Sequence, residues 1–376
     1  MNPDESEPAV EAPDASASRA GTPAPAPRSR RRSADTPRRK KKRTATFVLL
    51  GALLVVVLAA VAAIVYLGSL SQSFDGNTKK IPNAFPQESS RPAEPRPGPD
   101  GKTAVNILLV GSDSRGATGA AAESGTPSDQ RSDTMMLVHI PADRQHVYVV
   151  SIMRDLWVPI PDHGSAKINA ALAFGGVPLM VQTVESLLGQ RLDHVVFVDF
   201  EGFKGLTDAV GGVTVNVPKA FTASQTSDIH FDAGPQTMNG EQALAFVRER
   251  YAFADGDYQR VRDQQAFMKA LVSKLATPQT LANPITLANA VNGFSPYLTV
   301  DSGFTASAVA SLGVELVNVR PKDITTFTLP TNGTGWSTDG QSIVLLNQAA
   351  TTGLATAMAQ GTVPQYVAAN NLANGN

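Results

Sequence analysis

Short apolar runs alternate with helical periodicity along most of the chain. Runs rich in β-branched residues, bounded by Gly, Asp, Ser or Arg, predict four buried strands, at 105–110, 135–140, 147–152 and 195–200. Apolar residues recur at intervals of three and four between and after these runs, which predicts helices at 177–188, 202–210, 240–250 and 258–275. The combined pattern indicates an α/β domain in which helices cover a sheet.

The last hundred residues continue this pattern more weakly. They contain strand-like runs and one helical pattern, at 298–300, 324–329, 342–346 and 306–316. We expect these elements to complete one domain over residues 104–365, followed by a polar tail over 366–376. No segment of 20 to 50 residues repeats, which argues against a solenoid or a propeller.

An uncharged apolar segment precedes the domain. Residues 46–70 carry no charged side chain and are long enough to cross a bilayer as one helix. The basic run from Arg28 to Arg43 lies directly before this segment, so the positive-inside rule predicts a single-pass protein of the cell membrane with residues 1–45 in the cytoplasm and the domain outside. A cleaved signal peptide is the alternative, although its apolar region is normally shorter.

The segments on either side of the predicted span differ in charge and composition. Residues 1–45 hold 11 basic and 6 acidic side chains and almost no large apolar ones, which predicts a disordered tail. Residues 71–103 are polar and proline-rich, which is typical of a semi-rigid linker. The basic run would also suit nucleic acid, but membrane topology and anionic lipid explain it sufficiently, so we expect no nucleic-acid partner.

The composition excludes several kinds of chemistry. The chain has no cysteine, so disulfides, thiolate zinc sites and cysteine nucleophiles are excluded. Its five histidines show no metal-ligand spacing, and neither a Gly-x-Ser-x-Gly elbow nor a Walker loop is present. The 21 basic and 27 acidic residues after residue 45 do not favour a nucleic-acid-coating surface.

Two aspartates lie at predicted strand ends, where α/β folds place ligands. Asp113 follows the run 105–110 in the segment GSDSR, and Asp133 precedes the run 135–140 in RSDT. Neighbouring strands would bring these carboxylates together as a hard-cation site, of the kind that magnesium occupies when phosphates supply the remaining oxygens. The alternative is that both residues cap turns, in which Asp is common.

Basic side chains recur near the ends of the predicted elements. The arginine fork suits phosphate oxygens, so a cluster of these residues would hold a pyrophosphate. Scattered, they would be ordinary solvated or ion-paired side chains. The residues are Arg115, Arg131, Arg154, Lys167, Arg248, Arg250 and Arg260.

One predicted helix carries a polar stripe that continues into an apolar one. Asp257, Arg260 and Gln264 are spaced at i, i+3 and i+7, and Phe267 and Leu271 extend the same face. This arrangement predicts a polar group next to an apolar surface, although core packing is the favoured explanation for either apolar residue taken singly.

Seven motifs occur along the chain in this order: NILLVGSDSR, RSDTMMLVHI, VSIMRDLWVPIP, KINAALAFGG, VDFEGF, DAVGGVTV and ALAFVRERYAFADGDYQRVRDQQ. Together they resemble the LytR-CpsA-Psr family of cell-envelope glycopolymer transferases. The resemblance covers residues 104–275. It implies an α/β/α sandwich with a central mixed, largely antiparallel sheet and a hydrophobic pocket for a polyprenyl chain. It also implies a magnesium-dependent enzyme that moves a glycopolymer from a polyprenyl-pyrophosphate carrier onto peptidoglycan and releases polyprenyl phosphate.

The resemblance also assigns roles to residues. The metal-associated aspartates of the family match Asp113 and Asp133, and Met153 stands where the family usually has proline. The resemblance implies that Arg154, Asp113 and Arg260 are catalytic. The implied pyrophosphate-binding residues are Arg115, Arg154, Lys167, Arg248, Arg250, Asp257, Arg260 and Gln264.

In the implied reaction, magnesium and arginine neutralise charge on the pyrophosphate while a sugar hydroxyl attacks. Asp113 or Asp155 is a candidate to accept the hydroxyl proton. The polymer is left open between arabinogalactan, teichoic acid and other polymers. The alternatives are a polyprenyl-pyrophosphate phosphatase and a non-catalytic lipid-binding or regulatory envelope protein.

Overall fold

The computed structural model describes residue 66 and residues 68–373, except 113–131, 227 and 276–282. The expected cytoplasmic tail, nearly all of the predicted span, and Asp113 and Arg115 therefore lie outside the described residues.

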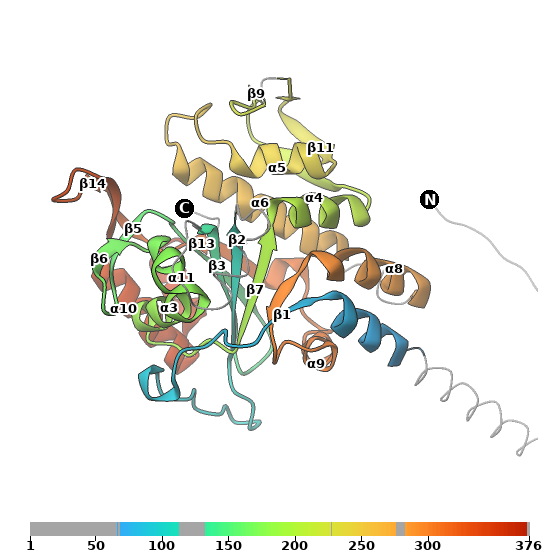
Figure 1. Ribbon diagram of the computed structural model, residues 1–376, viewed down its shortest axis with the longest axis horizontal. Helices are drawn as coiled ribbons and strands as arrows, with labels where there is room; N and C mark the ends of the chain where they lie inside the picture. Colours follow the sequence, from blue (N-terminus) through green and yellow to red (C-terminus); the bar gives the residue numbers. More distant parts are fainter. Residues whose placement is uncertain (1–65, 67, 113–131, 227, 276–282, 374–376) are drawn as a thin grey trace, which may run out of the picture. The chain divides into compact units, whose positions relative to one another are not determined.

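A seven-stranded mixed sheet forms the centre of the domain (Figure 1). Its strand order is β1-β12-β7-β2-β3-β4-β13. Three neighbouring pairs are antiparallel and three are parallel, so the expected mixed sheet is confirmed but is not largely antiparallel, because both edge strands join in parallel after long connections. The strands span Lys79–Ile81 (β1), Val105–Ser112 (β2), Ser132–Ile140 (β3), Val147–Ile152 (β4), His194–Asp199 (β7), Thr299–Asp301 (β12) and Ile324–Thr328 (β13).

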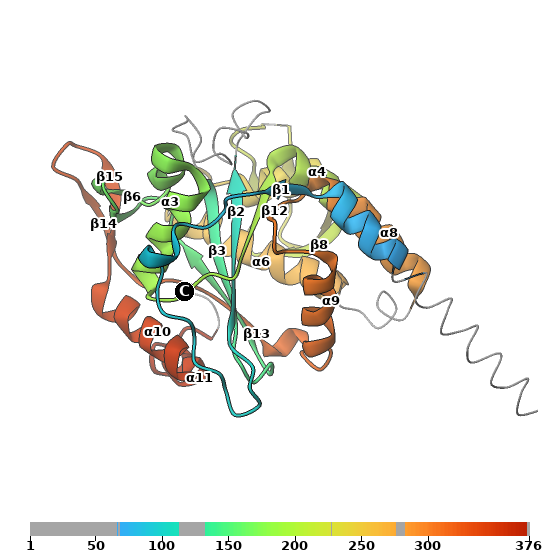
Figure 2. The same cartoon turned by 60° about the horizontal axis from the view of Figure 1, so that its bottom comes forward.

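Helices cover both faces of this sheet, which confirms the α/β/α sandwich (Figure 2). Alternation along β2 directs Leu108 and Val110 into the cluster of buried residues that α3 (Ala170–Leu188), α10 (Gln348–Gln360) and α11 (Val363–Ala369) complete. Ile107 belongs to the opposite cluster, against α8 (Pro284–Phe294) and α9 (Ala306–Glu315). The central strands are nearly continuous apolar runs because both of their faces are buried.

A smaller apolar cluster lies beside the main core. The strands β8 (Val213–Val217) and β11 (Gly234–Met238) pair with each other, as do β9 (Phe221–Thr222) and β10 (His230–Phe231). Together with α5 (Gly240–Arg248), they pack against α4 (Phe200–Ala209) and α6 (Asp257–Leu275) around Phe246 and Phe267. Figure 1 shows β9, β11 and α5 together at the top of the view.

A second sheet has the order β14-β15-β5-β6. It joins β5 (Leu156–Ile160) and β6 (Gly164–Lys167) to the hairpin of β14 (Thr331–Trp336) and β15 (Ser342–Leu346), which extends away from the sandwich in Figure 2. Because β5 begins four residues after β4 ends, the chain passes from one sheet to the other at Met153–Asp155.

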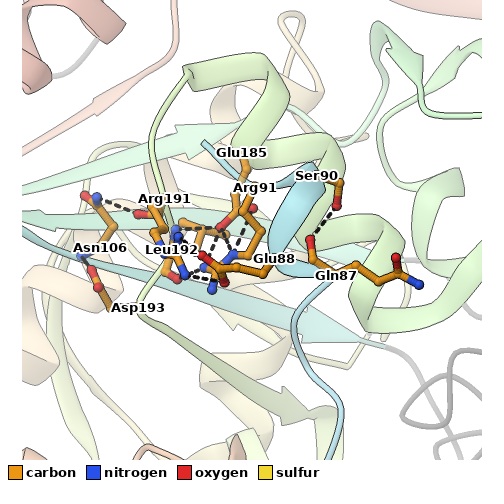
Figure 3. A network of polar contacts seen from close by, with 9 residues as sticks. All are labelled: Gln87, Glu88, Ser90, Arg91, Asn106, Glu185, Arg191, Leu192 and Asp193. Carbon is orange, nitrogen blue, oxygen red and sulfur yellow. Dashed lines mark hydrogen bonds and ion pairs between the residues drawn. The ribbon is translucent and has the colours of Figure 1, made fainter. Parts of the chain in front are cut away.

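The segment expected to be a linker belongs to the domain. Phe74 and Ile81 are buried, and β1 pairs with β12. Farther along, the Arg91 guanidinium donates to Glu185 on α3, with 2.7 Å between Nη2 and Oε1 (Figure 3). The expected polar tail likewise contains a buried Leu372. In both segments, isolated apolar side chains among polar ones bury themselves against the core.

Among the described residues, α3 is long and apolar enough to cross a membrane. Its side chains Leu172, Met180, Val181 and Val184 are fully buried in the main core. We therefore assign α3 as a core helix.

Candidate active site

An apolar cavity of about 330 Å³ lies between one face of the central sheet and the helices α4, α5 and α6. Strands β2, β3 and β7 supply one wall, and the helices supply the other. The apolar stripe of α6 reaches it through Phe267 and Leu271, which also belong to the smaller core. Other apolar side chains of the wall are Val196, Val198, Phe203, Leu244 and Val247.

Charged and polar side chains meet at this cavity. They come from the start of β3, the connection after β4, the end of α5 and the first turns of α6. These residues are Asp133, Arg154, Arg248, Arg250, Arg260 and Gln264. The structure therefore brings together six side chains that the sequence singled out, around an opening into apolar space.

Ion pairs connect four of these residues, Asp133, Arg154, Arg250 and Arg260, with Asp257. The Arg154 Nη1 donates to Asp133 Oδ1 at 2.6 Å, and its Nε lies 3.6 Å from Asp257 Oδ2. Arg260 Nη2 donates to the same Asp257 oxygen at 2.7 Å, and Arg250 Nη1 lies 3.5 Å from Asp257 Oδ1. Asp257 thus holds three guanidinium groups together.

The network continues to Lys167 at the end of β6. Lys167 Nζ lies 3.2 Å from Asp155 Oδ1, and Asp155 Oδ2 lies 3.7 Å from Arg154 Nε. We call Asp133, Arg154, Asp155, Lys167, Arg250, Asp257 and Arg260 the ion network. Its four cations exceed its three carboxylates.

Two arginines of the ion network have buried Nε donors. The Nε atoms of Arg154 and Arg260 are buried and have no hydrogen-bond partner among the described residues. Burial lowers the pKa of Arg260, and Asp257 opposes that effect, but a guanidinium stays charged in proteins. In the described part of the chain, the Arg154 Nε is compensated only by ion pairs with Asp155 and Asp257. The Arg260 Nε and the excess of positive charge in the ion network therefore suit an anionic ligand.

Arg248 and Gln264 contribute differently. The Arg248 guanidinium stacks on the ring of Phe200, with its Cζ 4.3 Å from the ring centroid. The Gln264 amide donates to the Val247 carbonyl at 3.2 Å, which ties α6 to the end of α5. Gln264 is therefore a positioning residue for the α5 terminus as well as a wall residue.

The sequence interpretation missed Glu249, which shapes the turn that carries Arg248 and Arg250. Its buried carboxylate accepts hydrogen bonds from the Ser224 N–H and hydroxyl and from the backbone N–H groups of Arg250, Tyr251 and Ala252. Burial would raise the pKa of Glu249, but these bonds lower it overall. The charged triplet Arg248–Arg250 contained this residue, but only the folded turn reveals its role.

The donor chemistry near Asp133 fits a magnesium ion. Magnesium takes one or two carboxylates together with phosphate oxygens and water. Asp133 lies at the cavity beside Arg154, so it offers one such carboxylate where phosphates would be held. The described residues contain no cluster of three or more His, Asp or Glu side chains suited to a metal, and the second predicted ligand, Asp113, lies outside them.

Met153, where the resemblance implies a proline, is buried in the main core. The Leu156 N–H donates to the Met153 carbonyl at 3.0 Å, forming the turn that leads from β4 into β5. Arg154 projects from this turn into the ion network, so Met153 is compatible with its position.

Several known proteins are similar to this chain in sequence. A cell wall biosynthesis protein of Corynebacterium glutamicum, LcpA, is 30% identical over 280 residues, covering 65% of this chain and 53% of that protein. The polyisoprenyl-teichoic acid–peptidoglycan teichoic acid transferase TagU of Bacillus mycoides is 39% identical over 180 residues, covering 48% and 55%. The chain thus spans about half the length of these relatives.

Solved structures share the architecture. TagV of B. subtilis superposes with a TM-score of 0.59 at 24% identity, over 70% of this chain and 98% of TagV. A LytR-Csp2A-Psr enzyme of Actinomyces oris gives 0.58 at 23% identity, over 75% and 96%. The sequence match to the LytR_cpsA_psr family extends over residues 68–360, which includes β1 and the whole ion network. The chain is therefore a member of the LytR_cpsA_psr family.

Proposed function

We propose that this protein transfers a glycopolymer from a polyprenyl-pyrophosphate carrier to peptidoglycan and releases polyprenyl phosphate. The observation that carries the proposal is the ion network at the apolar cavity, because it offers cationic donors to a pyrophosphate and apolar walls to the attached lipid. Relatives named as cell wall biosynthesis proteins and as teichoic acid transferases to peptidoglycan support it.

In the proposed reaction, Arg154, Arg250 and Arg260 bind the pyrophosphate oxygens and stabilise the charge that develops on them. An acceptor hydroxyl forms a bond to the phosphorus next to the donor sugar, and the bond from that phosphorus to the bridging oxygen breaks. The electron pair leaves with polyprenyl phosphate. A carboxylate, Asp155 or Asp113, takes the hydroxyl proton.

Asp133 and Asp113 would hold a magnesium ion, which supplies further positive charge to the pyrophosphate oxygens. Asp133 already contacts Arg154, so its carboxylate also orients the guanidinium at the cavity. We further propose that residues 46–70 anchor the protein in the cytoplasmic membrane with the domain outside. That placement brings the site near both a membrane lipid and the cell wall.

The test uses the full-length protein in detergent with a polyprenyl-pyrophosphate saccharide and uncross-linked peptidoglycan oligomers. Magnesium is present or chelated, and both polyprenyl phosphate release and saccharide attachment are followed. Metal-dependent attachment is the expected result. Release without attachment would instead identify a phosphatase, and tight lipid binding without release would identify a carrier or regulatory protein.

A further inference from the structure

A second opening lies beside the ion network, and we call it the polar cleft because carboxylates and hydroxyls line part of its wall. It has a volume of about 270 Å³ and is bounded by the α5–α6 connection and by the hairpin of β14 and β15. Residues that line it include Met153, Asp155, Tyr251, Asp257, Thr334 and Ser342. None of these residues lines the apolar cavity, whereas Arg250 lines both openings.

The ion network separates the two openings. Arg154 and Arg260 line the apolar cavity, whereas Asp155 and Asp257 line the polar cleft. The pairs that join these residues are short, with 2.7 Å between Arg260 and Asp257 and 3.6 Å between Arg154 and Asp257. A phosphate held by these cations would therefore have the apolar cavity on one side and the polar cleft on the other.

This placement matters because of the geometry of phosphoryl transfer. The attacking and leaving oxygens lie roughly in line on opposite sides of the phosphorus. If the leaving polyprenyl phosphate occupies the apolar cavity, the attacking hydroxyl must approach from the opposite side. The polar cleft would supply that approach, with Asp155 in its wall to accept the proton.

One exposed aromatic ring, Tyr251, lines the polar cleft, and a second, Trp336, lies on the hairpin that borders it. Tyr251 in its wall is 65% exposed, and Trp336 on β14 is 76% exposed. Trp336 pairs with Ser342 across the hairpin and lies two residues after Thr334, so it shares the face of the hairpin that lines the cleft. The flat apolar face and the polar edge of such rings suit the C–H faces and hydroxyls of pyranose rings.

The cleft is held together by fixed contacts. The hydroxyls of Tyr258 on α6 and Thr331 on β14 lie 2.7 Å apart, and the Val344 N–H on β15 donates to the Asp155 carbonyl at 2.8 Å. The Tyr251 ring stacks on Arg250, with 4.4 Å from the guanidinium carbon to the ring centroid. The hairpin and the Tyr251 ring are thus tied directly to residues of the ion network.

We infer that the polar cleft is the acceptor subsite and binds a pyranose unit of a peptidoglycan glycan strand, with Trp336 as its stacking platform. The inference rests on the proposed transferase function. The acceptor hydroxyl enters from the cleft and bonds to the phosphorus, the bridging P–O bond breaks on the cavity side, and the proton passes to Asp155.

The experiment compares the full-length protein with Trp336→Ala and Trp336→Tyr. The initial transfer rate is measured against the concentration of uncross-linked peptidoglycan oligomers at saturating donor, and donor affinity is measured separately without acceptor. Trp336→Ala should raise the acceptor KM about tenfold while donor affinity stays the same, and Trp336→Tyr should restore most of the loss. Val314→Ala on α9, where the side chain is 73% exposed, is the matched control and should match the unmodified protein.

The outcomes separate this inference from the function it rests on. An unmodified protein that shows no acceptor-dependent product overturns the proposed function itself. An unmodified protein that transfers, together with an unchanged acceptor KM in Trp336→Ala, overturns the acceptor subsite alone. A change in tryptophan fluorescence on adding the oligomers, lost in Trp336→Ala, would support direct contact.

Discussion

Arg154 donates a hydrogen bond of 2.6 Å to Asp133, which joins the turn after β4 to the start of β3 at the edge of the apolar cavity. This pair places a cation and a carboxylate side by side where a pyrophosphate and a metal ion would meet. The carboxylate orients the guanidinium through Nη1, while the guanidinium Nε makes ion pairs with Asp155 and Asp257.

Arg154→Ala should lower the transfer rate by about two to three decades, because it removes a guanidinium that stabilises developing charge. Initial rates with the polyprenyl-pyrophosphate saccharide and peptidoglycan oligomers measure this. Arg96→Ala, at an exposed position, serves as the control and should keep the normal rate. A normal rate for purified Arg154→Ala would show that the proposed site is wrong.

Glu249→Gln should weaken donor binding through the turn that it organises. The neutral amide loses the charge that receives five hydrogen bonds, so the turn with Arg248 and Arg250 should loosen. We expect an increase of about tenfold in the donor KM. Glu241→Gln, an exposed change in the first turn of α5, is the control. Equal donor KM values for the two variants would contradict the positioning role.

Val198→Phe should narrow the apolar cavity, whose wall includes this β7 side chain. A long-chain polyprenyl pyrophosphate should then bind about tenfold more weakly, whereas inorganic pyrophosphate should bind with unchanged affinity. Competition binding measures both. Val317→Phe, at a position 60% exposed, adds the same volume elsewhere and should change neither affinity. An equal loss of affinity for both ligands in Val198→Phe would argue against a lipid in the cavity.

Arg91→Ala should destabilise the domain by about 3 kcal/mol, because it leaves the Glu185 carboxylate buried without its guanidinium partner. Arg191→Ala breaks the neighbouring pair with Glu88, whose side chain is 70% exposed, and should cost much less. Urea unfolding of each variant measures the difference. Equal costs would mean that residues 71–103 are not fastened to the domain through Arg91.

The stability of the domain should fall on acidification below pH 6.5, partly because of His139. Burial lowers the pKa of His139 to about 4, whereas its ordinary value is 6.5, so the unfolded chain binds this proton first. The free energy of unfolding should therefore decrease between pH 6.5 and 4, by up to about 3 kcal/mol from this residue.

The buried imidazole Nδ1 lies 2.7 Å from Asn106 Oδ1, and a protonated ring would leave Nε2–H without a partner among the described residues. His139→Gln removes the titrating group and should flatten this part of the pH profile. An equally steep profile in that variant would assign the slope to other groups. Urea unfolding at several pH values provides the comparison.

The local pattern of apolar and polar residues was sufficient to predict the main strands and helices. The runs at 105–110, 135–140, 147–152 and 195–200 all form central strands. A strand that is buried on both faces needs apolar residues at nearly every position, so a continuous apolar, β-branched run indicates such a strand. Elements that depend on distant partners were missed. β1 contains two lysines in three residues and becomes a strand only because β12 pairs with it.

The sequence by itself determined which side chains carry charge near the ends of elements, and so nominated Asp133, Arg154 and Arg260. Tertiary structure alone decided that Asp257, about a hundred residues after Arg154, lies 3.6 Å from it. Tertiary structure also separated the apolar cavity from the polar cleft across the ion network. The physical reason is that charge and periodicity are local properties of the chain, whereas the distances between charges depend on strand order and on how the helices pack across the sheet.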